Sequence, residues 1–287
     1  MMIRYKDYLS LMKLRIDVFI TLSGLAAALA MARGPLSVSH TAWLATALML
    51  ASASAALFNQ YADRDLDGLM ERTRHRALPA GRVRPREVFV LGAILGVAGL
   101  GVALWAFNAM VAVHLFLGAL VYAVVYTVWL KRRSRLNIVI GGLAGSFAIL
   151  AGAASVRPEL CALPLLLALV MFFWTPSHFW SLALARTADY AKAGIPMLPV
   201  LVGPARTARA ILVNTALLVV SSLVPVAMGY LGGIYLIGAS LAGVYFLVFN
   251  VRLVRRPSPG LAWANFKASM VYLTILLAAL MADAFRS

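Results

Sequence analysis

The chain contains ten acidic residues, and four of them fall within nine positions. These four are Asp63, Asp65, Asp67 and Glu71. They follow an apolar run, 41–58, and carboxylates at the end of a membrane span are costly unless they pair with cations or metal ions. Asn59, Asp63 and Asp67 are spaced four residues apart, so on a helix their side chains share one face. Hard oxygen ligands in this arrangement suit Mg²⁺ that bridges to a phosphate, which favours an enzyme over a passive membrane protein.

Arginines follow this face closely in the sequence. Arg72, Arg74 and Arg76 lie directly after the acidic cluster, and guanidinium groups fit phosphate oxygens well. Arg72 and Arg76 are therefore predicted to bind phosphate. A second interpretation stays open, in which acids and arginines form salt bridges at a solvated helix end. Asp65 falls off the shared face and is expected to be a salt-bridge partner.

The composition predicts an integral membrane protein. Of the 287 residues, 63% are hydrophobic and 13% are charged, whereas soluble domains carry about a quarter charged residues. The net charge of +16 does not indicate a nucleic-acid partner, because the cations lie in short segments between apolar runs and act as topology signals. The single cysteine, Cys161, excludes an internal disulfide. We expect one membrane domain, 1–287, without a cleavable signal peptide.

Nine segments are apolar over about 20 residues, the length of a membrane-spanning helix. The predicted spans are 16–32, 41–59, 87–107, 109–130, 137–154, 161–184, 207–228, 231–250 and 263–284. All but three of the 26 lysines and arginines then lie on one side, and the three are Arg33, Arg157 and Arg286. Arg4 is one of the cations on the crowded side. This asymmetry predicts a cytoplasmic N-terminus and an external C-terminus. Two long loops, 60–86 and 185–206, fall on the cytoplasmic side.

The second long loop offers further polar groups. Asp189 is predicted to be a metal ligand and Lys192 a phosphate contact, although an ordinary loop with an incidental charge pair is the alternative. His178 follows a helix-bending proline in the segment 174–180. It is a candidate to contact a porphyrin or an anionic group, or else a histidine that is hydrogen-bonded inside a helix bundle. Lys131 begins a basic run that is most simply a topology signal, with a substrate phosphate or carboxylate as the alternative partner.

The motifs together resemble the UbiA superfamily of intramembrane prenyltransferases, and within it the heme-farnesylating sub-family. Asn59, Asp63 and Asp67 match the superfamily's first acidic motif. The sub-family resemblance extends through Tyr126-Thr-Val-Trp-Leu-Lys-Arg-Arg, Trp174-Thr-Pro-Ser-His-Phe-Trp and Asp189-Tyr-Ala-Lys-Ala-Gly-Ile-Pro-Met-Leu-Pro, and it covers nearly the whole chain.

This resemblance implies an all-α fold with nine transmembrane helices around a central cavity that opens toward the membrane. It implies Mg²⁺, farnesyl diphosphate and heme B as reactants, with heme O as the product. The metal would be held by Asn59, Asp63, Asp67 and Asp189. The protein would lie in a bacterial inner membrane. A later heme-modifying enzyme or a terminal oxidase assembly would receive the product.

Three departures from the family pattern leave the prenyl acceptor open. Leu14 and Ser177 stand where the family usually has proline, and 146–150 replaces a proline pair. An aromatic quinone precursor is therefore an alternative acceptor. A transporter without chemistry is a second alternative, but transport sites tend to lie near the bilayer midplane, whereas these acids lie at one end of a span beside arginines.

Overall fold

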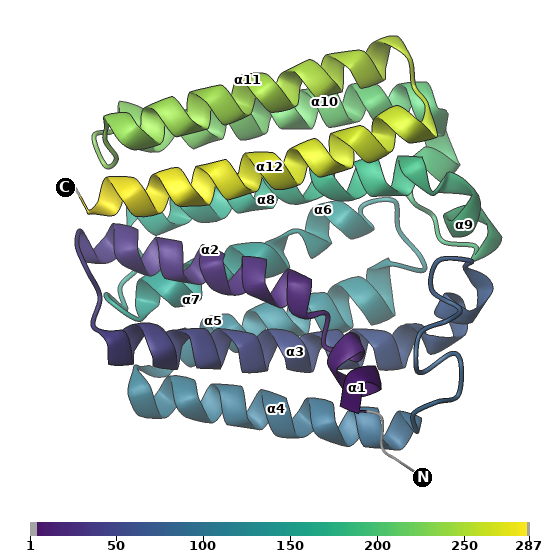
Figure 1. The fold of residues 1–287 in the computed structure, drawn as a ribbon, viewed down its shortest axis with the longest axis horizontal. Coiled ribbons are helices and arrows are strands. Elements are labelled where there is room, and N and C mark those ends of the chain that lie inside the picture. Colours follow the sequence, from purple (N-terminus) through teal and green to yellow (C-terminus); the bar gives the residue numbers. More distant parts are fainter. Residues whose placement is uncertain (1–4, 286–287) are drawn as a thin grey trace.

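The computed structural model describes residues 5–285, and within that range the regular elements are all helical (Figure 1). The elements are α1 (Tyr5–Leu11), α2 (Leu14–Ala32), α3 (Val38–Leu69), α4 (Pro85–Ala106), α5 (Ala109–Leu120), the π-helix η1 (Val121–Leu130), α6 (Asn137–Gly141), α7 (Leu143–Ala154), α8 (Ala162–Ala185), α9 (Thr187–Lys192), α10 (Leu198–Ala227), α11 (Gly233–Arg255) and α12 (Pro259–Ala284). The described residues do not include Arg4 and Arg286, which were counted in the charge asymmetry. They also leave out the outermost ends of the predicted domain 1–287.

Nine helical segments in the described part of the chain are long and apolar enough to cross a membrane, which confirms the predicted number. The fourth is α5 continued by η1, and the fifth is α6 with α7. Figure 1 shows the long helices lying side by side, with the two chain ends at opposite ends of the bundle. Such an arrangement is what an odd number of spans requires. The orientation of the bundle in the membrane stays a prediction.

The second span extends well past its predicted end. α3 continues to Leu69, so Asn59, Asp63 and Asp67 lie within a regular helix, and the predicted loop 60–86 in fact begins at Met70. The helix continues because Leu66 is buried in a hydrophobic cluster that lies beyond the apolar run. The common helix face inferred from spacing is therefore present in the structure.

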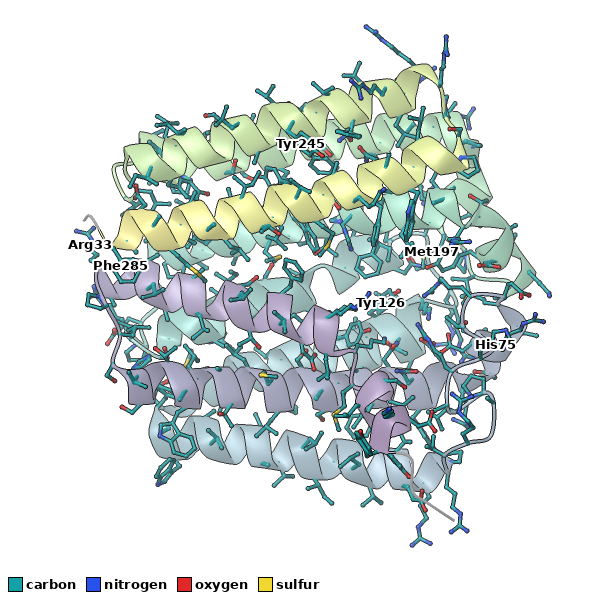
Figure 2. The ribbon with its side chains drawn as sticks, viewed as in Figure 1. Arg33, His75, Tyr126, Met197, Tyr245 and Phe285 are labelled. Atoms are coloured by element: carbon teal, nitrogen blue, oxygen red, sulfur yellow. The ribbon has the colours of Figure 1, made fainter. Side chains whose placement is uncertain are left out.

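The second long loop is also more ordered than its composition suggested. It contains the short helix α9, and α10 begins at Leu198 instead of 207. A break at Gly203, with φ of 78°, separates the first turn of α10 from the rest and is followed by Pro204. Both loops lie at the same end of the bundle: Figure 2 shows His75 and Met197 there, and Arg33 and Phe285 at the other end.

Two of the departures from the family pattern make contacts between helices. The Ser146 hydroxyl donates to the backbone carbonyl of Ala168 on α8 at 2.7 Å. The Ser177 hydroxyl lies 2.8 Å from that of Thr215 and accepts from the Asn214 amide at 2.7 Å, both on α10. Ser177 is fully buried, and its polar group is thus satisfied by packing. These serines therefore act in helix association.

Candidate functional site

The fourth span ends in the π-helix η1, whose wide turn positions polar side chains against α3. Its geometry is seen in the backbone N–H of Lys131, which donates to the Tyr126 carbonyl five residues earlier at 2.7 Å. Thr127 and Lys131 then face α3, where the Asn59 amide donates to the Thr127 hydroxyl at 2.9 Å. π-helices are rare and are frequently found at functional sites. The helix pair thus creates a polar patch inside an apolar bundle.

Asp63 is the centre of this patch and is 2% exposed. Its Oδ2 accepts from the Lys131 ammonium at 2.5 Å and from the Asn59 amide at 2.8 Å. Its Oδ1 is buried and has no hydrogen-bond partner among the described residues. A buried carboxylate oxygen without a donor is energetically costly, so this atom is poised to bind a ligand or a cation.

The first helix contributes a lysine that the sequence argument treated only as a topology signal. Lys13 precedes α2 in the left-handed conformation, with φ of 57°, and its ammonium donates to Asn59 Oδ1 at 2.5 Å and to the Tyr122 hydroxyl at 3.1 Å. Desolvation and, to a smaller extent, the charge of Arg76 lower the pKa of Lys13 to about 8, although the charge of Asp63 opposes the shift. The only feature of the sequence that could have identified Lys13 as a site residue is its position directly before the first span.

Asp67 completes the face that the spacing predicted. It is buried, and its Oδ2 accepts from the Arg76 guanidinium at 2.7 Å. We call Lys13, Asn59, Asp63, Asp67, Arg76 and Lys131 the anion cluster. Lys131 is buried and bonded to Asp63, so it lies at the site, and its role as a substrate contact stays a prediction. Lys131 is the residue that directly follows η1.

The remaining predicted residues of the first loop lie outside this cluster. Asp65 forms a two-bond salt bridge with Arg132 at 2.7 and 2.8 Å, which confirms it as a salt-bridge partner. Arg74 pairs with Glu71 at the surface. Arg72 is exposed at the same end of the bundle. On α3, the exposed salt bridge of Asp65 therefore lies on a different face from the buried anion cluster.

The second loop approaches the first through a tyrosine. Tyr190 on α9 is buried in one hydrophobic cluster with Leu66, Met70 and Tyr126. Burial raises the pKa of the Tyr190 phenol, and the nearby charges of Arg72 and Arg76 oppose that shift. The two long loop segments therefore pack against each other.

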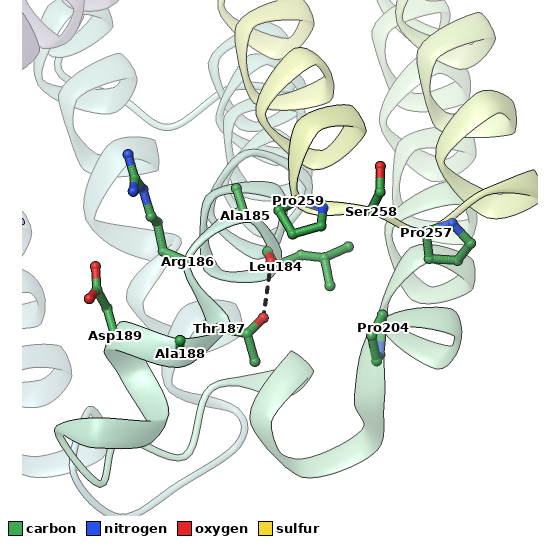
Figure 3. A pocket seen from close by; sticks show the side chains of 10 residues that line it. All are labelled: Leu184, Ala185, Arg186, Thr187, Ala188, Asp189, Pro204, Pro257, Ser258 and Pro259. Atoms are coloured by element: carbon green, nitrogen blue, oxygen red, sulfur yellow. Dashed lines mark hydrogen bonds between the residues drawn. The ribbon is translucent and has the colours of Figure 1, made fainter.

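Asp189 and Lys192 lie on the outer side of the same helix. Asp189 is half-buried and lines a pocket of about 400 Å³, and Lys192 is exposed. Figure 3 shows Asp189 and Arg186 on one side of this pocket, with Pro204 and Pro257 on the other. The role of Asp189 as a metal ligand and that of Lys192 as a phosphate contact stay predictions.

His178 is buried in α8 among aromatic rings. Its Nδ1 lies 2.7 Å from the Ser269 hydroxyl, and its ring stacks on Trp174 with centroids 4.3 Å apart. The Phe266 ring lies 4.4 Å away. These contacts agree with a histidine hydrogen-bonded inside a bundle, and its contact with an acceptor stays a prediction.

The donor set of the anion cluster fits a magnesium ion. Magnesium binds proteins through one or two carboxylates and completes its shell with substrate phosphates and water. Asp63 offers the unpartnered buried oxygen for this, and Asp67 lies one turn along the same face. In the described part of the chain, no group of three or more histidine, cysteine, aspartate or glutamate side chains could hold a metal by itself. Bound phosphate oxygens would therefore have to complete the coordination.

The sequence of this chain is similar to those of known proteins. A model of the UbiA prenyltransferase family matches residues 18–276. Protoheme IX farnesyltransferase 1 of Paramagnetospirillum magneticum is 49% identical over 97% of this chain and 98% of its own length. Protoheme IX farnesyltransferase of Alkalilimnicola ehrlichii is 42% identical, covering 98% of this chain and 93% of its own.

Solved structures share the fold. A UbiA homolog from Aeropyrum pernix superimposes with a TM-score of 0.77 at 20% identity, covering 94% of this chain and 98% of its own. A UbiA homolog from Archaeoglobus fulgidus, bound to GPP and Mg²⁺, gives a TM-score of 0.67 at 17% identity, covering 96% of this chain and 99% of its own. At these identities the similarity establishes the arrangement of helices.

Proposed function

This chain belongs to the UbiA prenyltransferase family, and we propose that it transfers the farnesyl group of farnesyl diphosphate to a vinyl group of heme B, which gives heme O. The relatives named above support this acceptor, because they match nearly the full length of the chain. A multi-pass prenyltransferase also agrees with the nine apolar spans of the described residues. We further propose a bacterial inner membrane as its location, with the anion cluster on the cytoplasmic side.

The anion cluster is the observation on which this proposal depends. Three cationic side chains and two carboxylates converge there, and they are Lys13, Arg76, Lys131, Asp63 and Asp67. The cations are therefore in excess by one charge, so the cluster attracts an anion. A transporter would more simply place its ionisable groups near the bilayer midplane.

The chain's own residues then account for cleavage of the diphosphate. Lys131, Lys13 and Arg76 would bind phosphate oxygens and stabilise the negative charge that develops as the carbon–oxygen bond breaks. Bound Mg²⁺, held by Asp63 and Asp67 with Asn59 and Asp189 as further expected ligands, would add Lewis-acid stabilisation of the leaving diphosphate. Arg72 and Lys192 are the proposed outer phosphate contacts.

The apolar interior governs the second half of the reaction. An allylic cation develops on the farnesyl carbon, the porphyrin vinyl group attacks it, and water adds to form a hydroxyethylfarnesyl side chain. Helix faces that exclude bulk water protect the cation from early hydrolysis. The same faces accommodate the isoprenoid tail. His178 is the proposed contact for the porphyrin, and a later heme-modifying enzyme or oxidase assembly is the proposed recipient.

Two aspartates on the same helix provide a matched test. Asp63→Asn should lower turnover by about 100-fold or more in membranes supplied with farnesyl diphosphate and heme B, because it removes a buried charge from the diphosphate site. Asp65→Asn breaks only an exposed salt bridge and should leave turnover within about twofold of wild type. Near-normal turnover in Asp63→Asn would contradict the proposed site.

Product analysis tests the acceptor separately. Mass spectrometry after incubation with heme B should detect farnesylated, hydroxylated heme. Prenylation of 4-hydroxybenzoate in place of heme B would instead support the quinone-precursor alternative. Transport of a substrate without a covalent product would support the transporter alternative.

A further inference from the structure

A further buried carboxylate lies in the bundle outside the anion cluster. Asp17 on α2 is 1% exposed, and its Oδ1 accepts from the Ser52 hydroxyl of α3 at 2.5 Å. Its Oδ2 is buried and has no hydrogen-bond partner among residues 5–285. A carboxylate inside a membrane span is costly and marks a functional site by default. The diphosphate chemistry described above does not use it.

The helix positions place Asp17 deeper in the membrane than the diphosphate site. Asp17 lies one turn, about 6 Å, beyond Lys13 along α2. Its partner Ser52 lies seven residues before Asn59 on α3, two turns or about 10 Å along the same side of that helix. Lys13 contacts Asn59 as Asp17 contacts Ser52, so the two contacts follow one seam between antiparallel helices. Asp17 therefore lies further into the bundle than the anion cluster, on the side where the proposed reaction would place the farnesyl carbon.

A hydroxyl adds a second unsatisfied group to this region. Thr21 is one turn further along α2, so it shares a face with Asp17. Its Oγ1 is also buried without a partner among the described residues. By contrast, the nearby hydroxyl of Ser23 donates to the Phe19 carbonyl within the same helix. A water that bridged Asp17 and Thr21 would satisfy both unpartnered atoms, as buried waters do in other proteins.

We infer that Asp17, assisted by Ser52 and Thr21, positions and deprotonates the water that completes the proposed heme reaction. This inference rests on the proposed function. When the vinyl π electrons form the bond to the farnesyl carbon, a cation remains on the vinyl carbon next to the pyrrole ring. The water oxygen bonds to that carbon, and one water proton moves to Asp17 Oδ2. The carboxylate later releases this proton, so the products are heme O, diphosphate and one proton.

A water held by Asp17 would also make bulk water unnecessary. A single held water reacts only after the carbon–carbon bond has formed, because before that step it has no adjacent cation on the acceptor. Ser52 fixes one carboxylate oxygen, which leaves the other directed at the water. General base catalysis of this kind typically contributes about 100-fold or more.

Asp17→Asn tests this role because it keeps the shape of the side chain and removes its basicity. We expect the KM for farnesyl diphosphate to stay within about twofold and the yield of hydroxylated heme to fall by about 100-fold. A farnesylated product lighter by one water should appear instead, since the cation then loses a carbon-bound proton. Thr21→Val should shift the products in the same direction, and Ser23→Ala is the matched control that should not.

The outcomes separate the two proposals. Wild-type protein that forms no product from heme B would contradict the proposed acceptor. An Asp17→Asn enzyme with the wild-type product ratio would contradict the inference alone. A raised KM with an unchanged product ratio would also overturn it, because Asp17 would then support the diphosphate site. If Asp17→Asn does not fold, an unchanged product ratio in Thr21→Val overturns the inference.

Discussion

The ion pair between Lys131 and Asp63 gives the sharpest prediction. Both side chains are nearly inaccessible, at 9% and 2% exposed, and their charged atoms are 2.5 Å apart. Replacing Lys131 with methionine fills a similar volume but leaves Asp63 without its cation. Removing one partner of a buried ion pair typically costs about 3–5 kcal/mol of stability. We expect a destabilisation of this size, measured by thermal unfolding in detergent.

The double variant separates a structural ion pair from a binding site. Asp63→Asn with Lys131→Met removes both charges, so its stability should return to within about 1 kcal/mol of wild type or exceed it. Its turnover should stay about 100-fold or more below wild type, because the site has lost one cationic phosphate contact and one proposed metal ligand. Recovery of both stability and turnover would refute our reasoning and leave a salt bridge as the only role of the pair. An undestabilised Lys131→Met variant would show that Asp63 is hydrated.

Three further changes test the account at other positions. Arg76→Ala should raise the KM for farnesyl diphosphate about tenfold, since a hydrogen bond to a charged group contributes about 1.5–3 kcal/mol; an unchanged KM in steady-state assays would argue against phosphate contact. Asp189→Asn should lower turnover by about 100-fold if the second loop supplies a metal ligand, and wild-type turnover would remove Asp189 from the site. Ser177→Ala should lower the free energy of unfolding by about 1–3 kcal/mol without changing kcat, because its partners Thr215 and Asn214 are in packing contacts. Altered acceptor preference at unchanged stability would disagree with that role.

The amino-acid sequence predicts the helices well because membrane spans depend on a long apolar run, which is a local property. The shared face of Asn59, Asp63 and Asp67 is likewise local, since it follows from helical periodicity, and the structure has it. The extension of α3 depends on packing of Leu66 against residues far along the chain, which periodicity does not report.

The site residues that the sequence argument missed depend on tertiary contacts. Lys13 resembles an ordinary topology signal, yet its ammonium group contacts Asn59 inside the bundle. Lys131 was a candidate substrate contact from the sequence, but its ion pair with Asp63 was not predicted. Asp17 is a single acid within an apolar run, and its importance is evident only from its burial and its bond to Ser52. A charged residue at the edge of a span can therefore face either water or the interior, and the backbone geometry decides.

The location of the bound diphosphate tests the central claim most directly. An experimental structure with Mg²⁺ and a non-hydrolysable farnesyl diphosphate analogue should show the diphosphate against Lys131 and Arg76, with a metal ion on the free oxygen of Asp63. The diphosphate seated instead in the pocket between Arg186 and Pro257, with Asp63 still paired only to Lys131, would contradict the account.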